Sequence, residues 1–475
     1  MKNNIRFICI LLIILMLAGC APKEVSSFVP PQQTDLPEDP PPGQQEPAKT
    51  EPEKEETPLY LSPKFCLASA EIPERHPYPE VDDFANFEDF DAAYDLWAQD
   101  NFARNKNIES VQNANLDFSH RVTNALLKAE SGENAACSPA NLYMALAMLA
   151  EVTDGESRAQ VLKLLGQEDT TVLRTTADTL WETMYNDDGA TTCIPANALF
   201  LRDEELYKEQ TVDTVAKSYH ADLFRGKMGT KEYDNILQEW LNHRTRGLLE
   251  KQARSVETNP ETIMVLASAL YFSNKWEATF DARDNFSAPF YGSKGESKAT
   301  YMKRSATGAY YNGEDFDAVA KKFEMGGSMW LIRPREGVSL SDILSDKEYL
   351  QVIKREDESR IGYPLVHLSL PKFDVSSTID LKEELPSLGI SDVFDRNAAD
   401  FSPLTREPSF LDSARHDVRV MIDEEGCKAA AFTVMVADGA AAVKPSEIEF
   451  TLDHPFIFLI EYQGVILFTG VVQNV

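Results

Sequence analysis

The fold of this chain is decided by one stretch near its C-terminus, Glu424-Glu425-Gly426-Cys427-Lys428-Ala429-Ala430-Ala431-Phe432-Thr433. Residues 416–423, just before it, alternate polar and apolar side chains with the two-residue period of a half-buried strand. After Gly426 the period continues with only small residues on one side, whereas Lys428, Ala430 and Phe432 lie on the other. Because overpacking a core costs about 1–3 kcal/mol per misfit, small side chains suit a strand that slides between other strands. The stretch therefore predicts a strand that is not yet part of a sheet.

This pattern resembles the hinge of the serpins, the serine protease inhibitors whose reactive loop inserts into their own main sheet. The resemblance implies that Gly426 is the pivot, where a β-carbon would restrict the turn. The family usually has threonine or serine at the position of Cys427, and cysteine is also small enough to be buried. The implied hinge consists of Glu425, Gly426, Cys427, Lys428, Ala429, Ala430, Ala431 and Thr433.

Further matches to the serpins follow in order across the chain. Ser138-Pro139 predicts a helix start, because serine caps a helix and proline fits its first position. The apolar run of residues 265–272 is typical of a strand buried on both faces. The resemblance implies an α+β serpin fold over residues 108–475, with mixed β-sheets, about eight to nine helices and an exposed reactive-centre loop at about 426–446. The remaining matches are Trp240-Leu241-Asn242, Thr245-Arg246-Gly247, Leu370-Pro371-Lys372-Phe373, Asp453-His454-Pro455-Phe456 and Phe468-Thr469-Gly470.

Four polar residues match the shutter, the hydrogen-bonded cluster that serpins place beneath the central strands: Ser138, Asn141, Ser268 and His416. The family usually has serine where this chain has Asn141 and asparagine where it has Ser268. The exchange is compatible with a paired network, because both side chains donate and accept. Alternatively, His416 is a satisfied core histidine without influence on sheet opening. Trp276 and His454 match the breach, where the loop first enters the sheet, although Trp276 is equally compatible with plain core.

Counting forward from Gly426 with the family's usual spacing places the reactive bond between Ala440 and Ala441. Small residues around this bond suit a protease with a shallow specificity pocket, such as an elastase-like or subtilisin-like enzyme. A trypsin-like target would need Lys444, but Pro445 follows it and is poorly accepted after a cut. The alternative positions for the cut are Ala437, Gly439, Ala442 and Val443.

The N-terminus has the layout of a signal peptide, with Lys2 and Arg6 around the start of an apolar run that ends at Ala18. The run is too short to span a membrane comfortably. Leu17-Ala18-Gly19-Cys20 resembles a bacterial lipobox, which implies removal of residues 1–19 and lipidation of Cys20. We therefore expect an extracellular or cell-surface protein that is lipid-anchored to a bacterial membrane. The alternative is an ordinary secretory signal with an incidental cysteine.

Two segments separate this anchor from the main domain. Residues 20–81 are rich in proline and glutamate, which predicts an extended, disordered linker. Residues 82–107 interleave acidic residues with aromatic ones at helical spacing, which predicts an acidic aromatic helical extension. This helix either packs on the main domain or binds a partner. Its aromatic residues are Phe84, Phe87, Phe90, Tyr94 and Trp97.

The composition limits the partners of this chain. A formal net charge of −31 over 475 residues repels phosphate backbones and argues against a nucleic-acid partner. No metal site or cofactor is expected. Four cysteines remain besides Cys9 and Cys20, and their pairing cannot be read from spacing, although a disulfide at Cys427 would tether the hinge. These four are Cys66, Cys137, Cys193 and Cys427.

An enzyme is not expected, because the sequence lacks the HExxH, GxSxG, Walker and GxGxxG motifs and its seven histidines are scattered. The favoured hypothesis is a monomeric, surface-tethered inhibitor that traps extracellular serine proteases with a preference for small residues. One alternative is a non-inhibitory serpin that acts as a surface binding or carrier lipoprotein. Another is an acidic cell-wall lipoprotein with a structural role. The small residues on the inward side of the hinge favour the inhibitor.

Overall fold

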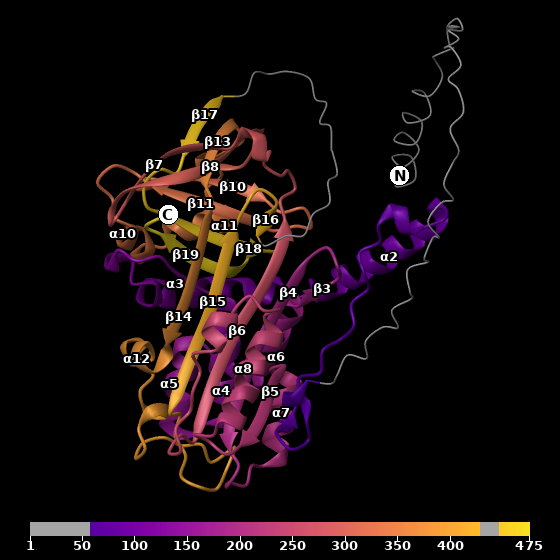
Figure 1. Cartoon of the computed structure of the whole chain (residues 1–475), viewed down its shortest axis with the longest axis vertical. Helices are drawn as coiled ribbons and strands as arrows, with labels where there is room; N and C mark the ends of the chain where they lie inside the picture. The colour runs from indigo at the N-terminus through magenta and orange to yellow at the C-terminus, as the bar shows by residue number, and fades with distance from the viewer. Residues whose placement is uncertain (1–57, 428–445) are drawn as a thin grey trace, which may run out of the picture. The chain divides into compact units, whose positions relative to one another are not determined.

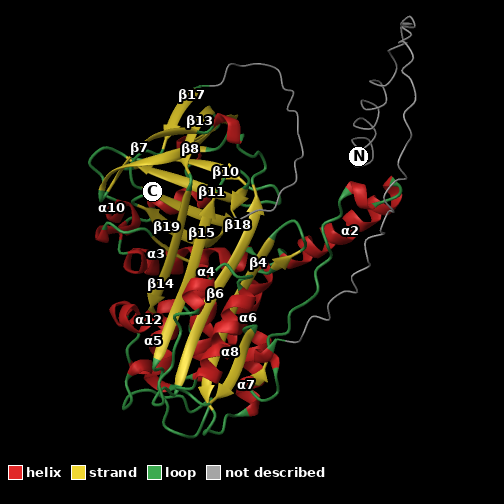
Figure 2. Ribbon diagram, viewed as in Figure 1, coloured by secondary structure: helices red, strands yellow, loops and turns green. Residues whose placement is uncertain are grey.

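Three β-sheets and the helices packed on them make up the part of the chain that the structure describes (Figure 1, Figure 2). The computed structural model describes residues 58–427 and 446–475. The predicted signal peptide and Cys20 lie outside the described residues, as do Ala440 and Ala441 of the predicted reactive bond. The same holds for the predicted hinge residues Lys428, Ala429, Ala430, Ala431 and Thr433.

The main sheet contains eight described strands in the order β1-β5-β4-β6-β16-β15-β14, with β3 beside β4. It is a mixed sheet, because β4 is parallel to β5 and β6 is parallel to β15, whereas the other neighbours are antiparallel. The strands are β1 (Cys66–Ala68), β5 (Ala221–Gly226), β4 (Thr192–Arg202), β3 (Asn186–Asp187), β6 (Met264–Lys275), β16 (Gly426–Cys427), β15 (Ser413–Ile422) and β14 (Phe373–Asp380).

Two smaller sheets complete the described β-structure. One has seven strands: β12 (Ile361–Gly362), β9 (Tyr310–Asn312), β10 (Phe316–Lys322), β11 (Ser328–Pro334), β18 (Phe456–Tyr462), β19 (Val465–Val472) and β2 (Ala135–Cys137). The other has four: β17 (Glu447–Thr451), β13 (Leu365–Pro371), β8 (Gly295–Thr307) and β7 (Phe286–Gly292). The pair β13 and β17 is parallel, so this sheet is mixed as well.

Eleven α-helices occur among the described residues, and eight of them are longer than four residues, in agreement with the expected eight to nine. The predicted α+β class is confirmed. None of these helices is both long and apolar enough to cross a membrane. The helices are α2 (Phe87–Arg104), α3 (Glu109–Leu127), α4 (Pro139–Val152), α5 (Gly155–Leu165), α6 (Thr170–Met184), α7 (Glu209–Ser218), α8 (Lys231–Arg244), α9 (Glu250–Ala253), α10 (Leu340–Ser345), α11 (Gln351–Lys354) and α12 (Leu381–Glu384).

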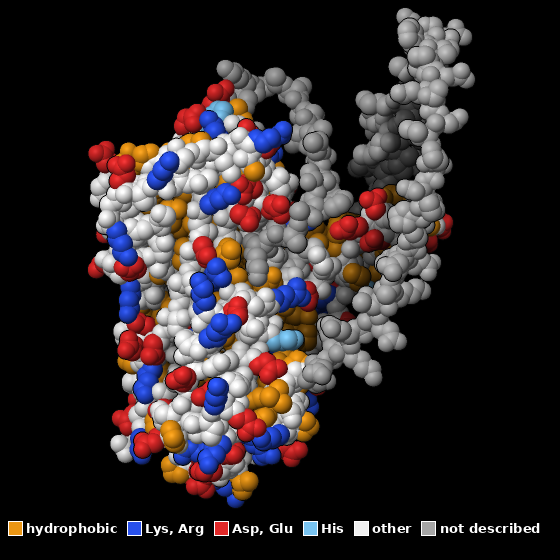
Figure 3. Space-filling view, in the orientation of Figure 1, with side chains coloured by type: hydrophobic (Ala, Val, Ile, Leu, Met, Phe, Trp, Pro, Cys, Tyr) orange, Lys and Arg blue, Asp and Glu red, His pale blue; other side chains and the backbone are white. Residues whose placement is uncertain are grey.

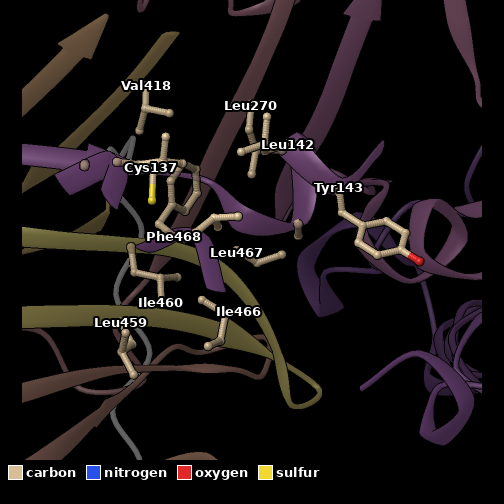
Figure 4. Packing of buried hydrophobic residues seen from close by; sticks show 14 of the residues in the cluster. Cys137, Leu142, Tyr143, Leu270, Val418, Leu459, Ile460, Ile466, Leu467 and Phe468 are labelled. Carbon is tan, nitrogen blue, oxygen red and sulfur yellow. The ribbon is translucent and has the colours of Figure 1, made fainter. Parts of the chain in front are cut away.

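Helix α4 lies at the centre of the larger hydrophobic core. It starts as predicted, because the Ser138 side chain accepts a hydrogen bond from the Asn141 amide and Pro139 occupies the first turn. All of its residues are buried, and it contacts β4 and β6 of the main sheet and β19 of the seven-stranded sheet. Figure 4 shows Leu142 of α4 with Leu270 of β6 and Phe468 of β19 in this core.

The opposite face of the main sheet is covered by α8 and by the segment that precedes β1. Strand β6 accordingly contributes side chains to two clusters, with Leu266 and Leu270 in one and Ala267 and Ala269 in the other. The prediction of a strand buried on both faces is therefore confirmed.

The predicted end of the linker at residue 81 is wrong. Tyr60 and Phe65 are only 1% and 4% exposed and pack among the side chains of α8. Strand β1 pairs with β5 at the edge of the main sheet. The average composition of residues 20–81 hid this short apolar segment, whose burial outweighs the extended preference of the proline-rich residues around it. The folded part of the chain thus already includes residues 58–68.

Helix α2 covers most of the predicted helical extension. Its C-terminal half is tied to the rest of the structure, since Trp97 Nε1 donates to Asp188 Oδ2 at 2.9 Å and Arg104 Nη1 to the Tyr185 carbonyl at 3.0 Å. Along its N-terminal half the aromatic rings contact one another in sequence, and Phe87 is 71% exposed. The extension is therefore a helix that is anchored at one end only.

The packing of residues 58–68 predicts that Phe65→Ala destabilises the folded domain by about 3 kcal/mol, because the substitution removes a fully buried ring. Urea unfolding followed by circular dichroism measures the change. Leu59→Ala is the matched control, since Leu59 is 52% exposed and its loss should leave the urea midpoint nearly unchanged. Equal midpoints for the two variants would contradict the revised boundary.

Candidate functional site

The residues that begin the predicted hinge are already part of the main sheet. Strand β16 lies between β6 and β15 and is antiparallel to both: Gly426 pairs with Lys275, and Cys427 pairs with Asn274 and Ile422. Further along, β6 and β15 pair directly, with residues 265–269 facing residues 413–417. The main sheet is thus closed at one end and divided at the other, and β16 occupies the first positions of the division (Figure 1).

A tight turn leads the chain from β15 back into the sheet. The Asp423 carboxylate accepts the amide hydrogens of Glu425 at 2.9 Å and Gly426 at 3.2 Å, which reverses the chain direction. Trp276 holds this turn from the other side, because its backbone amide donates to the Glu425 carbonyl at 2.8 Å and its Nε1 to the Asp423 carbonyl at 3.0 Å. The Trp276 ring is buried and stacks on Phe323 with the centroids 4.7 Å apart. Trp276 therefore positions the start of the hinge.

Glu424 is a site residue that the sequence analysis missed. Its carboxylate accepts hydrogen bonds of 2.5 Å from Lys372 Nζ and Asn285 Nδ2. Burial favours a raised pKa for Glu424, but the hydrogen bonds from Lys372 and Asn285 outweigh it and lower the pKa. The three residues are far apart in sequence, and only the doubled acid at 424–425 was a local signal.

Gly426 is required for a reason that differs from the predicted one. A β-carbon there would lie 2.3 Å from the Asn274 carbonyl oxygen and 2.9 Å from Lys275 Cα. The constraint is thus the close approach of two backbones, not the freedom of a turn.

Cys427 is buried, and burial raises the pKa of its thiol to about 12, which makes the thiol unreactive. The described cysteines, Cys66, Cys137, Cys193 and Cys427, are all free thiols, so no disulfide tethers Cys427.

The four predicted shutter residues come together beneath the closed part of the sheet. Asn141 Nδ2 donates to Ser268 Oγ at 2.9 Å, which is the contact that the exchanged residue types allow. The Ser138 amide donates to His416 Nε2 at 2.9 Å, so the ring proton lies on Nδ1, 3.2 Å from Ser268 Oγ. Asn197 of β4, which no sequence signal indicated, also belongs to this cluster, because its Nδ2 donates to Asn141 Oδ1 at 3.0 Å.

These residues form one row across the sheet. Asn197, Ser268 and His416 are register partners on β4, β6 and β15, and all three are buried. Burial lowers the pKa of His416 to about 4, so the imidazole is neutral and can accept the Ser138 amide hydrogen. The row therefore links β4, β6 and β15 within the closed part of the sheet.

The contacts given for the described residues do not bring His454 together with Trp276, its predicted partner at the breach. The His454 side chain is 65% exposed, bonds to Asp453 Oδ1 at 2.9 Å and packs against Tyr291. The match at 453–456 did not show which side chains His454 contacts. In the described residues, no group of three histidine, cysteine, aspartate or glutamate side chains is arranged to hold a metal ion.

Residues 113–475 match the family model described as "Serpin (serine protease inhibitor)". This chain is a serpin. Serpins in general are protease inhibitors and mostly not enzymes, which agrees with the absence of catalytic motifs from the sequence. The resemblance drawn from the hinge is therefore confirmed at the level of the family.

The serpin has similar relatives in several organisms. Serpin-Z2B of Triticum aestivum is 30% identical over 361 residues, which cover 72% of this chain and 90% of the relative. Leukocyte elastase inhibitor A of Mus musculus is 28% identical over 383 residues, which cover 76% and 99%. An uncharacterized serpin-like protein of Methanosarcina acetivorans is 28% identical over 358 residues, which cover 72% and 81%.

Solved structures share the fold. The native state of Tengpin, a thermophilic serpin, superimposes with a TM-score of 0.69 at 25% identity, covering 77% of this chain and 95% of Tengpin. A thyroxine-binding globulin in complex with thyroxine has a TM-score of 0.67 at 22% identity, covering 77% and 99%. The serpin fold is confirmed by these neighbours.

The environment of His416 predicts a loss of stability in acid. Between about pH 6.5 and 4 an unfolded histidine binds a proton that the buried His416 does not, so the folded state loses about 3 kcal/mol as the pH falls through this range. Below pH 4 this group makes no further contribution. Urea midpoints of wild type and His416→Gln between pH 7 and 4 measure the difference, and the variant should have a shallower dependence.

His454→Gln is the control for this experiment, since its side chain is exposed and should leave the wild-type pH dependence in place. An identical pH dependence in His416→Gln and wild type would show that His416 does not limit the stability of the sheet in acid.

Proposed function

We propose that this serpin inhibits serine proteases by suicide trapping. A protease attacks the bond between Ala440 and Ala441 and forms an acyl-enzyme, and the freed N-terminal side of the loop then inserts between β6 and β15. The observation that carries the proposal is strand β16, which already lies antiparallel to both flanking strands at the divided end of the sheet. Insertion would extend this strand and carry the bound protease with it.

The register of β16 supports a specific path for the proposed insertion. Cys427 faces Asn274 and Ile422, so each later residue would pair one position further back along β6 and one further back along β15. Thr433 would then arrive opposite Ser268 and His416, on the same side as Cys427. A small hydroxyl residue suits this polar row, since it can hydrogen-bond to the groups that it separates.

The energetics of insertion support trapping. The five residue pairs between 265–269 and 413–417 must part, whereas the new strand gains backbone hydrogen bonds on both sides. At about 1 kcal/mol net per hydrogen bond, with side-chain burial added, a strand of roughly ten residues gains on the order of ten kcal/mol. The native state is then metastable, and the interactions across the closed part of the sheet form a kinetic barrier.

The target proteases that we propose are extracellular and have shallow pockets, elastase-like or subtilisin-like. Support comes from the small residues around Ala440 and from relatives named Leukocyte elastase inhibitor A and Antichymotrypsin-2. We further propose that the protein acts as a monomer on a bacterial cell surface, lipid-anchored through Cys20. The lipobox-like residues 17–20 and the apolar run before them support this localisation.

The alternative function is that of a non-inhibitory carrier. A solved neighbour is a thyroxine-binding globulin, and an open cavity of about 830 Å³ lies between α3 and α10, with His120, Arg121 and Ser341 in its wall. The inward hinge positions, Cys427, Ala429, Ala431 and Thr433, are all small and suit insertion, so they favour the inhibitor.

The proposed function predicts a covalent complex. Residues 21–475, which retain the compact unit Glu56–Val475, are mixed with an elastase-like serine protease and separated on a denaturing gel. A stable band near the summed mass, together with a released peptide that begins at Ala441, is the expected result. Clean cleavage of the loop with full recovery of protease activity would overturn the inhibitor and favour the carrier.

Gly426→Arg should convert the inhibitor into a substrate, because even a β-carbon at this position would lie 2.3 Å from the Asn274 carbonyl oxygen. Because insertion is then slower, more of the acyl-enzyme is hydrolysed before the protease is trapped. The stoichiometry of inhibition, the number of inhibitor molecules consumed per protease molecule inhibited, should therefore rise several-fold. Titration of a fixed amount of protease measures it. Gly362→Ala is the control, since a β-carbon there meets its nearest neighbour, Pro364 Cδ, at 3.8 Å. Equal stoichiometry for Gly426→Arg and wild type would refute the role of the hinge.

A further inference from the structure

A second polar site lies behind Trp276, where the seven-stranded sheet faces the four-stranded sheet. It is a cavity of about 110 Å³, enough for several water molecules, between β8, β10 and β13. Its wall contains two cationic side chains from different strands, Arg304 of β8 and Lys321 of β10. The apolar side chains of Val366 and Leu368 of β13 also lie in this wall.

The side chains of Arg304 and Lys321 carry more N–H donors than the surrounding residues have acceptors for. Lys321 Nζ has three donors and donates to the Ala278 carbonyl, and Arg304 Nη1 donates to the Thr279 carbonyl at 2.6 Å. Arg304 Nε is buried and has no partner among the described residues. Lys321 Nζ also lies 5.1 Å from the centroids of the Trp276 and Phe280 rings, which attract a cation but accept no strong hydrogen bond.

The charges in the cavity are not balanced. Arg304 and Lys321 repel each other, and the acidic residue in the wall, Glu277, forms no ion pair with either of them among the described contacts. Lys322 is exposed and adds a third positive charge at the rim. Two half-enclosed cations with unused donors form a site for a negatively charged group, because an anion both accepts the hydrogens and removes the repulsion.

We propose that the cavity lined by Arg304 and Lys321 binds a small anion from solution, a carboxylate or an oxyanion of similar size. The Arg304 guanidinium and the Lys321 ammonium hold its oxygens, and Val366 and Leu368 exclude larger ligands. This cavity is distinct from the divided end of the main sheet, but Trp276 contacts both. Its indole Nε1 and its backbone amide donate to the carbonyls of Asp423 and Glu425, and the centroid of its ring lies 5.1 Å from Lys321 Nζ.

Binding of an anion should be coupled to protonation of Lys321. Burial and the nearby Arg304 guanidinium lower the pKa of Lys321 to about 7, against the opposite effect of Glu277. A bound anion favours the ammonium form, so binding at pH 8 takes up a proton and binding at pH 6 does not. For an anion that binds only the protonated form, affinity should be about tenfold weaker at pH 8 than at pH 6.

Isothermal titration of the protein with acetate and with sulfate tests the proposal, since neither anion titrates between pH 6 and 8. Titrations run at constant ionic strength in two buffers of different ionisation enthalpy. We expect a buffer-dependent heat at pH 8 and a buffer-independent heat at pH 6. Lys321→Met should lose the buffer dependence and bind several-fold more weakly at pH 6. Lys303→Met is the matched control, because Lys303 is an exposed neighbour on β8 outside the cavity wall, and it should behave as wild type.

The wild-type protein also provides a test that does not depend on a variant. With ¹³C-labelled lysine, the Cε resonance of one lysine should titrate with a midpoint near pH 7. This midpoint should shift to a higher pH when acetate is added. The proposal is overturned if neither anion gives heat beyond dilution at pH 6, or if Lys321→Met binds both anions with the same affinity as wild type at pH 6.

Discussion

The structure depends on a sheet whose two halves are joined over only part of their length. Strands β6 and β15 pair directly through residues 265–269 and 413–417, and beyond that point β16 lies between them. A parallel contact of five residue pairs is a small interaction to hold two halves of a large sheet together. Much of the closure therefore falls to the polar row of Asn197, Ser268 and His416 and to the helix beneath it.

The hydrogen bonds of this row contribute less stability when formed than they cost when broken. Each hydrogen bond within it contributes about 1 kcal/mol, but breaking it without replacement would leave buried polar groups unsatisfied at a greater cost. Asn197 Oδ1 already lacks a partner among the described residues, so the row is not fully satisfied in the closed sheet. Polar side chains in this row hydrogen-bond to each other across β6 and β15, which apolar side chains at the same positions could not do.

Local signals in the sequence were sufficient for the fold and for part of the site. The Ser138-Pro139 helix start and the apolar run at 265–272 each have a short-range physical cause, and the structure contains the helix and the buried strand that they predict. The stretch after Glu425 was predicted to be a strand outside any sheet, but its described residues, Gly426 and Cys427, already pair within the main sheet. Contacts between distant residues were not accessible. The pairing of Glu424 with Lys372 requires the fold, and Asn197 lies within an apolar strand that gives no hint of a polar partner.

Two features were not accessible from the sequence for the same reason. The match around His454 did not show which side chains this residue contacts, and the proline-rich composition of residues 20–81 concealed Tyr60 and Phe65. The average composition of a long segment does not reveal the few residues whose burial makes it fold. A matched sequence motif likewise does not show which side chains are in contact.

The short strand β1 has a consequence for solubility. It covers β5, which would otherwise be the edge of the main sheet with a row of unpaired amide and carbonyl groups. Open edges invite pairing with extended segments of other molecules, and natural sheets commonly cover or shorten them. With β1 in place, β5 has fewer unpaired backbone groups to which an extended segment of another molecule could add.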